Sequence, residues 1–254
     1  MSDVAGFGRR FGTLADLYDE ARPSYPDELF DLLDETIGGI AGTAIVDLAA
    51  GTGVQTRPLV ARRAEVVAVD VDPRVLQRLR SRSPDVPVVV GRSEWLPLRD
   101  AVADVVTCAN AWHWLPTDRT VEEVARVLRP GGYLALWWAV NPWGDGIDWE
   151  EAQSAVFDRW DRLCGPGPER TGTRPSDAAD DLRARGIEVV VSREFAWTRS
   201  VTRAEHLRTL ETYSTQLARP EDQRRALLAE IDAALAPWPM IAQRFWGPLV
   251  VARF

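Results

Sequence analysis

Two acidic residues, each at the end of an apolar stretch rich in valine and isoleucine, are the side chains best placed to do chemistry in this chain. Asp47 precedes a glycine-rich turn, and Asp70 follows about 20 residues after the glycines. In an α/β unit this spacing places an adenosine-containing ligand across the strand ends, where Asp70 would accept hydrogen bonds from both ribose hydroxyls. Gly51 and Gly53 lack a Cβ, so we expect the backbone to pass close beneath that ligand.

The turn reads Asp47-x-Ala49-x-Gly51-x-Gly53 and resembles the first motif of class I S-adenosylmethionine (SAM)-dependent methyltransferases, acid-x-Gly-x-Gly-x-Gly. Alanine stands in the first glycine slot, which is a mild departure if the backbone there stays at negative φ, a conformation that alanine tolerates. The alternative is a dinucleotide fold with the pattern Gly-x-Gly-x-x-Gly, but its third glycine would fall on Thr56. Asp47 also favours SAM, because a carboxylate attracts an ammonium group and repels a pyrophosphate.

Further segments resemble one branch of these enzymes, the group that contains the trans-aconitate methyltransferases. They are Arg22-Pro23-Ser24-Tyr25-Pro26, Gly91-Arg92-Ser93-Glu94-Trp95-Leu96-Pro97-Leu98, Ala109-Asn110-Ala111-Trp112-His113-Trp114 and Arg129-Pro130-Gly131-Gly132. The resemblance covers nearly the whole chain and is most specific over 44–140. It implies SAM as the cofactor and S-adenosylhomocysteine as its product.

The pattern of strands and helices predicts an α/β fold: a Rossmann-like, doubly wound, mostly parallel seven-stranded sheet with a helical N-terminal extension and helical cap insertions. Strands are expected near 44–48, 65–70, 86–90, 103–109, 132–139, 187–197 and 244–254. Helices are expected after Pro26, from an N-cap at Thr117, and over 149–163, 202–218 and 221–235, with a loop over 165–180. We expect a single domain with an N-terminal lid (1–40), a SAM-binding core (41–140) and a cap with the final strands (141–254).

The resemblance assigns eleven residues to the cofactor: Tyr18, Arg22, Asp47, Ala49, Gly51, Gly53, Asp70, Val71, Ser93, Glu94 and Asn110. Val71 is expected against one face of the adenine. Tyr18 and Arg22 would close over the cofactor and bind its carboxylate. Asn110 would face the methionine part of SAM, or would instead stabilise a turn.

Position 92 departs from the family pattern. An aspartate usually stands there and contacts the adenine amino group, whereas the Arg92 guanidinium cannot accept that hydrogen bond. Either Glu94 accepts the hydrogen bond from the adenine amino group instead, or backbone groups and packing hold the adenine. A solvent-facing position for Arg92 is an equal alternative.

The catalytic candidates are His113 and Tyr25, and the substrate candidates are Trp112, Trp114, Trp138 and Asn141. A histidine can titrate near the working pH and act as a base, but a histidine between two tryptophans can equally be a packed side chain. Methyl transfer does not require a base, because the sulfonium is already an activated leaving group. Each tryptophan taken alone fits the core, whereas together they indicate an apolar, aromatic acceptor and a wall that suits a cation.

Composition bounds the possible partners. The 254 residues include no lysine and carry a formal net charge of −8, which argues against nucleic acid and anionic membranes as partners and excludes a Schiff-base lysine. Two histidines and two cysteines are too few for a zinc cluster or a disulfide framework, so no metal is expected. Without a secretory pattern or a long apolar run, a cytoplasmic location is expected.

These observations predict a transferase that moves a methyl group from SAM to a small-molecule acceptor, aromatic or a carboxylic acid, with oxygen as the favoured target. The mechanism would be one in-line displacement without metal. The alternatives are an NAD(P)-dependent oxidoreductase, a non-catalytic binding protein of the methyltransferase fold, and a protein that uses SAM for electrostatic assistance only. The acceptor and the oligomeric state stay open.

Overall fold

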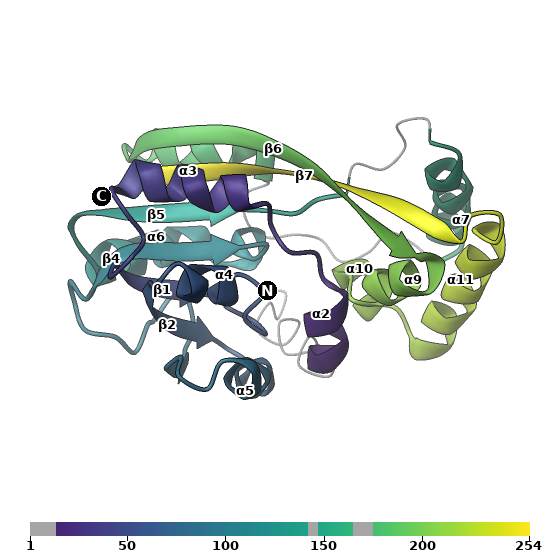
Figure 1. Cartoon of the computed structure of the whole chain (residues 1–254), viewed down its shortest axis with the longest axis horizontal. Coiled ribbons are helices and arrows are strands. Elements are labelled where there is room, and N and C mark those ends of the chain that lie inside the picture. Colours follow the sequence, from purple (N-terminus) through teal and green to yellow (C-terminus); the bar gives the residue numbers. More distant parts are fainter. Residues whose placement is uncertain (1–13, 142–146, 165–174) are drawn as a thin grey trace.

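A computed structural model of the chain describes residues 14–141, 147–164 and 175–254. In this part of the chain seven strands form one sheet in the order β3-β2-β1-β4-β5-β7-β6 (Figure 1). The strands are β1 (Ala44–Leu48), β2 (Glu65–Asp70), β3 (Val88–Val90), β4 (Ala103–Ala109), β5 (Leu128–Trp137), β6 (Glu188–Thr202) and β7 (Met240–Arg253). The strands β1 to β5 pair in parallel, and β7 runs antiparallel to both β5 and β6. The predicted doubly wound, mostly parallel, seven-stranded sheet is confirmed.

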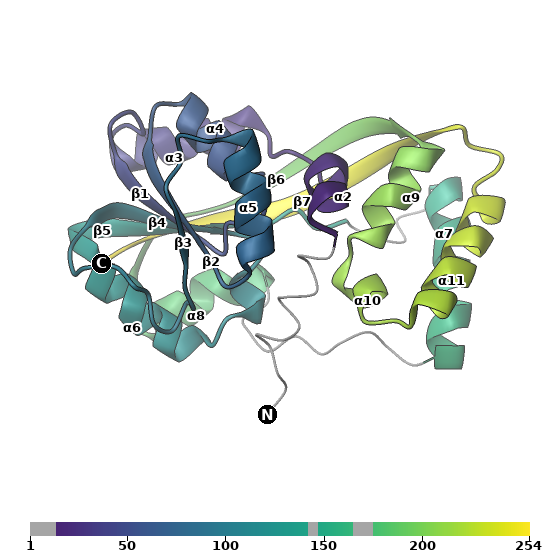
Figure 2. The same ribbon diagram turned by 90° about the horizontal axis from the view of Figure 1, so that it is seen from below.

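Helices cover both faces of the sheet (Figure 2). The helices with four residues or more are α2 (Ala15–Ala21), α3 (Asp27–Ile37), α4 (Thr56–Ala61), α5 (Pro73–Arg82), α6 (Thr117–Val127), α7 (Asp148–Cys164), α8 (Ala178–Ala184), α9 (Arg203–Glu211), α10 (Ser214–Leu217) and α11 (Glu221–Ala234). The strand side chains alternate between the faces, so that Leu134 and Leu136 pack with α6 and α8, whereas Ala135 and Trp137 pack with α3. This alternation explains why β-branched and leucine residues fill consecutive strand positions: both faces are buried.

The predicted helix after Pro26 is confirmed. Pro26 is the N-cap of α3, and Asp27 and Glu28 lie in its first turn, where acidic side chains favour the positive end of the helix dipole. Gly38 ends the helix at φ +82°, a left-handed conformation that glycine adopts without a Cβ penalty.

Several boundaries differ from those predicted. The N-cap of α6 is Pro116 and not Thr117, whose side chain bonds the Leu115 carbonyl instead. The helix predicted over 202–218 is two helices, because the backbone turns at Thr212-Tyr213 between α9 and α10. The loop predicted over 165–180 lies partly outside the described residues, and its end belongs to η3 (Pro175–Asp177) and to α8, a helix of seven residues that periodicity did not reveal.

The last two strands are longer than predicted and extend past the sheet. They pair with each other from Glu188 opposite Arg253 to Thr202 opposite Met240. Their far ends meet α7, α9 and α11 (Figure 1), which enclose a separate hydrophobic cluster around Ile241. We call this unit, residues 147–164 and 199–243, the helical cap. The α2 helix lies between the cap and the sheet, in contact with α9 on one side and α5 on the other (Figure 2).

No helix in the described ranges is both long enough and apolar enough to span a bilayer.

Candidate active site

The strand order reverses between β1 and β4. The strands β2 and β3 lie on one side of β1, and the chain then crosses to the other side of β1, where it forms β4. In open α/β sheets ligands bind in the crevice outside the carboxyl ends of the strands at such a point. Asp47 on β1 and Thr107 on β4 are register partners at this position. The topology therefore places the predicted acid at the expected binding crevice.

Asp47 is fully buried and surrounded by hydrogen-bond donors. Its carboxylate accepts from the hydroxyls of Thr56 at 2.5 Å and Thr107 at 3.1 Å, and from the Gln55 side-chain amide. Burial raises the pKa of Asp47 to about 7, although the two hydroxyls oppose the shift. A cationic group brought beside this carboxyl would favour its ionised form.

The glycine-rich turn departs from one expectation. Ala49 adopts φ +54°, so the condition for a mild departure, a negative φ at this position, is not met; the turn has the left-handed conformation there even for a residue with a Cβ. Gly51 and Gly53 also have positive φ. A Cβ on Gly53 would lie 2.9 Å from Leu79 Cγ, whereas a Cβ on Gly51 would meet nothing within 4 Å. Gly53 therefore makes room for α5, and Gly51 is the glycine that leaves open space beside the strand ends.

Asp70 is held in place at the tip of β2. It accepts hydrogen bonds from the backbone N–H groups of Gly51 and Asp72, both at 2.9 Å. Burial raises the pKa of Asp70 despite these bonds. Val71 follows directly and is half-buried. The bond from Gly51 N joins Asp70 to the glycine turn, so that the two predicted motifs form one unit.

In the 91–98 loop the side chains of Arg92 and Glu94 pair with each other. Arg92 is exposed, and its Nε donates to Glu94 Oε1 at 2.6 Å. Burial opposes ionisation of Glu94, but its own backbone N–H and Arg92 outweigh that effect and lower its pKa. Ser93 is buried and accepts a hydrogen bond from the Thr120 hydroxyl at 3.0 Å.

Asn110 joins β4 to the N-terminal segment. Its backbone is left-handed at φ +54°, its amide donates to the Tyr25 hydroxyl at 2.8 Å, and its oxygen accepts from Ala139 N at 2.8 Å. Burial raises the pKa of Tyr25 well above the usual value for a phenol. Tyr25 is thus a neutral hydrogen-bonding group at ordinary pH and a poor base.

The tryptophans around His113 differ in their burial. The Trp138 indole donates to His113 Nδ1 at 3.1 Å, which fixes the neutral tautomer with its proton on Nε2. Trp112 and Trp138 belong to the main core, with 0% of each side chain exposed. Trp114 is half-buried, and its ring centroid lies 5.1 Å from that of His113.

At the cap side of the crevice Arg22 lies between two tyrosine rings. Its guanidinium carbon is 4.8 Å from the ring centroids of both Tyr18 and Tyr213. The Tyr213 hydroxyl donates to Asn141, whose amide in turn donates to the Arg244 carbonyl. Tyr213 was not among the sequence candidates, because a single aromatic residue in a helical region carries no signal of its partners.

Comparison with known proteins decides the family. The chain is 40% identical over 169 residues to an uncharacterized methyltransferase of Mycobacterium tuberculosis, which covers 65% of this chain and 67% of the relative. This chain is a class I SAM-dependent methyltransferase. An uncharacterized methyltransferase-like protein of Schizosaccharomyces pombe is 31% identical over 232 residues, 88% of this methyltransferase and 85% of the relative. The family profile described as a methyltransferase domain matches residues 46–136.

Solved structures agree with this assignment. A putative type II methyltransferase from Anaeromyxobacter dehalogenans superimposes with a TM-score of 0.65 at 26% identity, over 91% of this chain and 97% of the other. The predicted class, transferase activity and SAM cofactor are confirmed, and the oxidoreductase alternative was wrong. The narrower resemblance to the trans-aconitate branch stays a prediction.

The residues at the strand ends fit SAM. The space beside Gly51 is open, and Asp70 presents a fixed carboxylate next to it. Asp47 supplies a second acid, suited to the cationic end of SAM because a nearby positive charge favours its ionised form.

Proposed function

We propose that this methyltransferase transfers the methyl group of SAM to an oxygen atom of a small molecule, by one in-line displacement. The observation that carries the proposal is the pair of acids, Asp47 and Asp70, at neighbouring strand tips on either side of the open Gly51 turn. The preference for oxygen is supported by a relative named malonyl-[acyl-carrier protein] O-methyltransferase, from Methylococcus capsulatus. It is 42% identical over 98 residues, or 36% of each chain.

At the adenosine end, Asp70 accepts the two ribose hydroxyls and Val71 packs against the adenine ring. Ser93 and Glu94 border the adenine edge, where Glu94 is ionised and can accept a hydrogen bond. The turn through Ala49, Gly51 and Gly53 passes beneath the cofactor, where Gly51 leaves open space.

At the methionine end, Asp47 attracts the ammonium group, and Arg22 with Tyr18 holds the carboxylate. Asn110 stabilises the crevice through its hydrogen bonds to Tyr25 and Ala139. When bound, SAM supplies a methyl group on a sulfonium, which leaves as a neutral thioether.

The chain's own contribution to the rate is mainly alignment. Placing acceptor, methyl carbon and sulfur in line can supply roughly 7–11 kcal/mol in favourable cases. Neither Tyr25, whose phenol is held neutral, nor His113, whose Nδ1 already accepts from Trp138, is arranged as a strong base. This arrangement suits an acceptor oxygen that has no proton to lose, such as a carboxylate. Trp114 and Asn141 stay candidate acceptor contacts, while Trp112 and Trp138 would support them from the core.

Calorimetric titration with SAM tests the cofactor site. We expect saturable heat with the wild type, and at least tenfold weaker binding for Asp70→Ala with an unchanged circular dichroism spectrum. Asp85→Ala, an exposed acid after α5, is the matched control and should bind SAM as the wild type does. Unchanged affinity in Asp70→Ala would show that the ribose assignment is wrong.

A methyl-donor assay over acids, phenols and amines tests the acceptor side. We expect S-adenosylhomocysteine to accumulate with oxygen acceptors and methyl esters or ethers to form. Methylation of amines alone would overturn the oxygen assignment, and SAM binding without product from any acceptor class would favour a non-catalytic role.

A further inference from the structure

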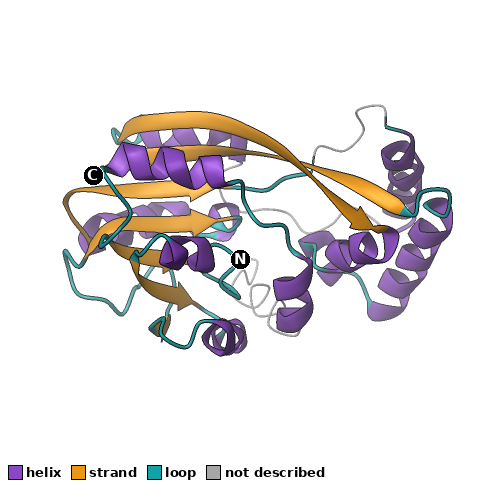
Figure 3. Cartoon of the chain, in the orientation of Figure 1, coloured by secondary structure: helices purple, strands orange, loops and turns teal. Residues whose placement is uncertain are grey.

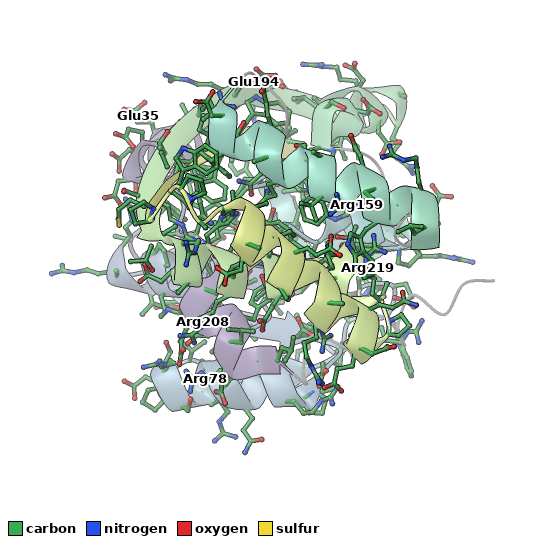
Figure 4. The ribbon with its side chains drawn as sticks, turned by 90° about the vertical axis from the view of Figure 1, so that its right-hand side faces the viewer. Glu35, Arg78, Arg159, Glu194, Arg208 and Arg219 are labelled. Atoms are coloured by element: carbon green, nitrogen blue, oxygen red, sulfur yellow. The ribbon has the colours of Figure 1, made fainter. Side chains whose placement is uncertain are left out.

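Two arginines at the junction of cap and core lack acidic partners. Arg22 follows α2 and Arg199 lies on β6; both are half-buried, and neither forms an ion pair within the described parts of the chain. Their neighbours differ: Arg57, Arg78 and Arg208, which also surround α2, all pair with its acids (Figure 4 shows Arg78 and Arg208). In a chain of net charge −8, two adjacent cations without acids call for an explanation.

Neutral groups surround Arg22. Its Nη2 donates to the Thr212 carbonyl at 2.9 Å, and the rings of Tyr18 and Tyr213 lie at 4.8 Å from its guanidinium carbon. Its Nε is buried and has no hydrogen-bond partner among the described residues. Aromatic faces and one carbonyl orient this guanidinium but do not neutralise it.

Arg199 is held even more firmly. Its Nη2 donates to the Ala21 carbonyl at 2.7 Å and to the Thr209 hydroxyl at 3.1 Å, and its Nε donates to Gln243 Oε1 at 2.6 Å. Burial lowers the pKa of Arg199, and the charge of Arg22 acts in the same direction, whereas Tyr213 and the charge of Glu205 oppose the shift. This guanidinium loses hydration without forming a direct ion pair within the described residues, which is costly for the protein alone.

A buried chain of hydrogen bonds fixes the orientation of the Arg199 guanidinium. Because Arg199 donates to Gln243 Oε1, the Gln243 amide donates to His206 Nδ1, and the remaining ring N–H of His206 donates to Gln153. Burial, followed by the charge of Arg199, lowers the pKa of His206 to about 4, so the chain stays neutral at ordinary pH. The cap therefore carries a positioned guanidinium whose hydrogen-bond partners in the described residues are all uncharged.

We propose that Arg199 binds a carboxylate group of the methyl acceptor, and that the charge of the neighbouring Arg22 adds to the attraction. Nε and Nη2 of Arg199 are already engaged, which leaves Nη1 to donate charge-assisted hydrogen bonds to a carboxylate. Arg199 lies against α2, the helix that also contacts α5. The inference rests on the proposed function and names its substrate class. Since a carboxylate held by a guanidinium is a weak nucleophile, the acceptor should carry a second oxygen that receives the methyl group.

The first experiment uses the wild-type chain saturated with S-adenosylhomocysteine. Phenylacetate and phenylacetamide have nearly the same shape, but only the acid is charged. At constant ionic strength we expect the acid to bind at least tenfold more tightly by calorimetry and to raise the melting temperature more than the amide does.

Variants then test whether Arg199 is the cation that binds the acid. We expect Arg199→Gln to weaken phenylacetate binding at least tenfold, Arg199→Lys to restore part of it, and SAM affinity to stay within twofold of the wild type. Arg193→Gln is the matched control, since Arg193 is an exposed arginine on the same strand whose guanidinium lies over the Phe195 ring. It should change neither affinity.

Three results would overturn the proposal: equal affinity of acid and amide for the wild type, unchanged acid affinity in Arg199→Gln, or a loss of SAM affinity in that variant as large as the loss for the acid. The last result would assign the cation to the methionine carboxylate of SAM. If Arg199→Gln does not fold, the comparison of acid and amide on the wild type decides alone. Failure of the wild type to bind SAM would instead contradict the proposed cofactor site.

Discussion

At the scale of single residues, Asp47 is a buried carboxyl in the crevice whose protonation depends on its surroundings. Its carboxyl is removed from water by β1 and β4, and its pKa of about 7 compares with about 3.9 for an unfolded aspartate. Ionisation of Asp47 is thus opposed in the folded chain, which leaves an acid ready to respond to a bound cation.

This pKa predicts how stability changes with pH. The folded chain holds the proton of Asp47 more tightly than the unfolded chain, so the contribution is complete below about pH 4 and lost as pH rises through about 7. Three pKa units correspond to on the order of 4 kcal/mol. Urea unfolding across this range should show that the wild type loses more free energy of unfolding than Asp47→Asn, while Asp85→Asn follows the wild type. Equal slopes for the wild type and Asp47→Asn would contradict the assignment.

Gly53 makes a second prediction at this scale. Alanine there meets both a left-handed backbone at φ +85° and Leu79 Cγ at 2.9 Å. We expect Gly53→Ala to lower the free energy of unfolding by about 1–3 kcal/mol from strain, and by a further ~1–3 kcal/mol from overpacking. Gly42→Ala, at φ +77° with open space, should show the strain alone. Equal costs in urea unfolding would rule out the Leu79 contact as a cause.

At the scale of elements, α2 connects the cap to the glycine turn. Asp19 on α2 is only 4% exposed and pairs with Arg57, Arg78 and Arg82 at 2.8, 3.3 and 3.2 Å. Arg57 also donates to the Thr52 carbonyl in the glycine turn at 2.9 Å. The helix that carries Tyr18 and precedes Arg22 is thereby tied to the loop proposed to lie under the cofactor.

Loss of this ion-pair cluster should loosen α2. Asp19→Asn removes the carboxylate that these ion pairs share, so α2 is held less firmly and we expect SAM affinity to fall on the order of tenfold, or about 1.4 kcal/mol. Asp16→Asn is the control, because Asp16 is 80% exposed and pairs only with Arg78 among the described residues. Calorimetry at low and high salt should show a weaker salt dependence for Asp19→Asn. Wild-type SAM affinity in Asp19→Asn would show that α2 does not cover the cofactor.

At the scale of the whole molecule, β6 and β7 run from the sheet into the helical cap (Figure 3). They contribute side chains to the hydrophobic clusters of both. Leu249 and Val251 pack in the sheet core, whereas Ile241, on the same strand, packs in the cap with Leu227 and Ile231. Continuous strand pairing between these clusters should make the cap and the sheet unfold together.

A substitution that creates a cavity in the cap tests whether the cap and the sheet unfold together. Ile231→Ala removes a fully buried side chain and should cost about 2–5 kcal/mol. We expect the urea transitions followed by circular dichroism and by tryptophan fluorescence to shift together. Leu228→Ala, a half-buried neighbour, should cost less. Separate transitions, with only one of them shifted, would mean that the cap unfolds independently.

The sequence by itself determined the features that depend on neighbours along the chain. Apolar, β-branched strands that alternate with helices, an acid at the tip of each of the first two strands, and the glycine turn are all local patterns. The positions of Asp47, Gly51 and Asp70 at the strand ends could therefore be predicted, together with five parallel strands and the fold class. Their spacing alone brings them to one edge, because parallel strands end at the same side of a sheet.

Tertiary structure alone decided what depends on contacts between distant segments. Tyr213 and Arg199 reach Arg22 only because β6 and α9 fold back onto α2, and no periodicity signals that approach. The contact of Gly53 with Leu79 likewise depends on how closely α5 packs, which is an outcome of packing and not of local pattern.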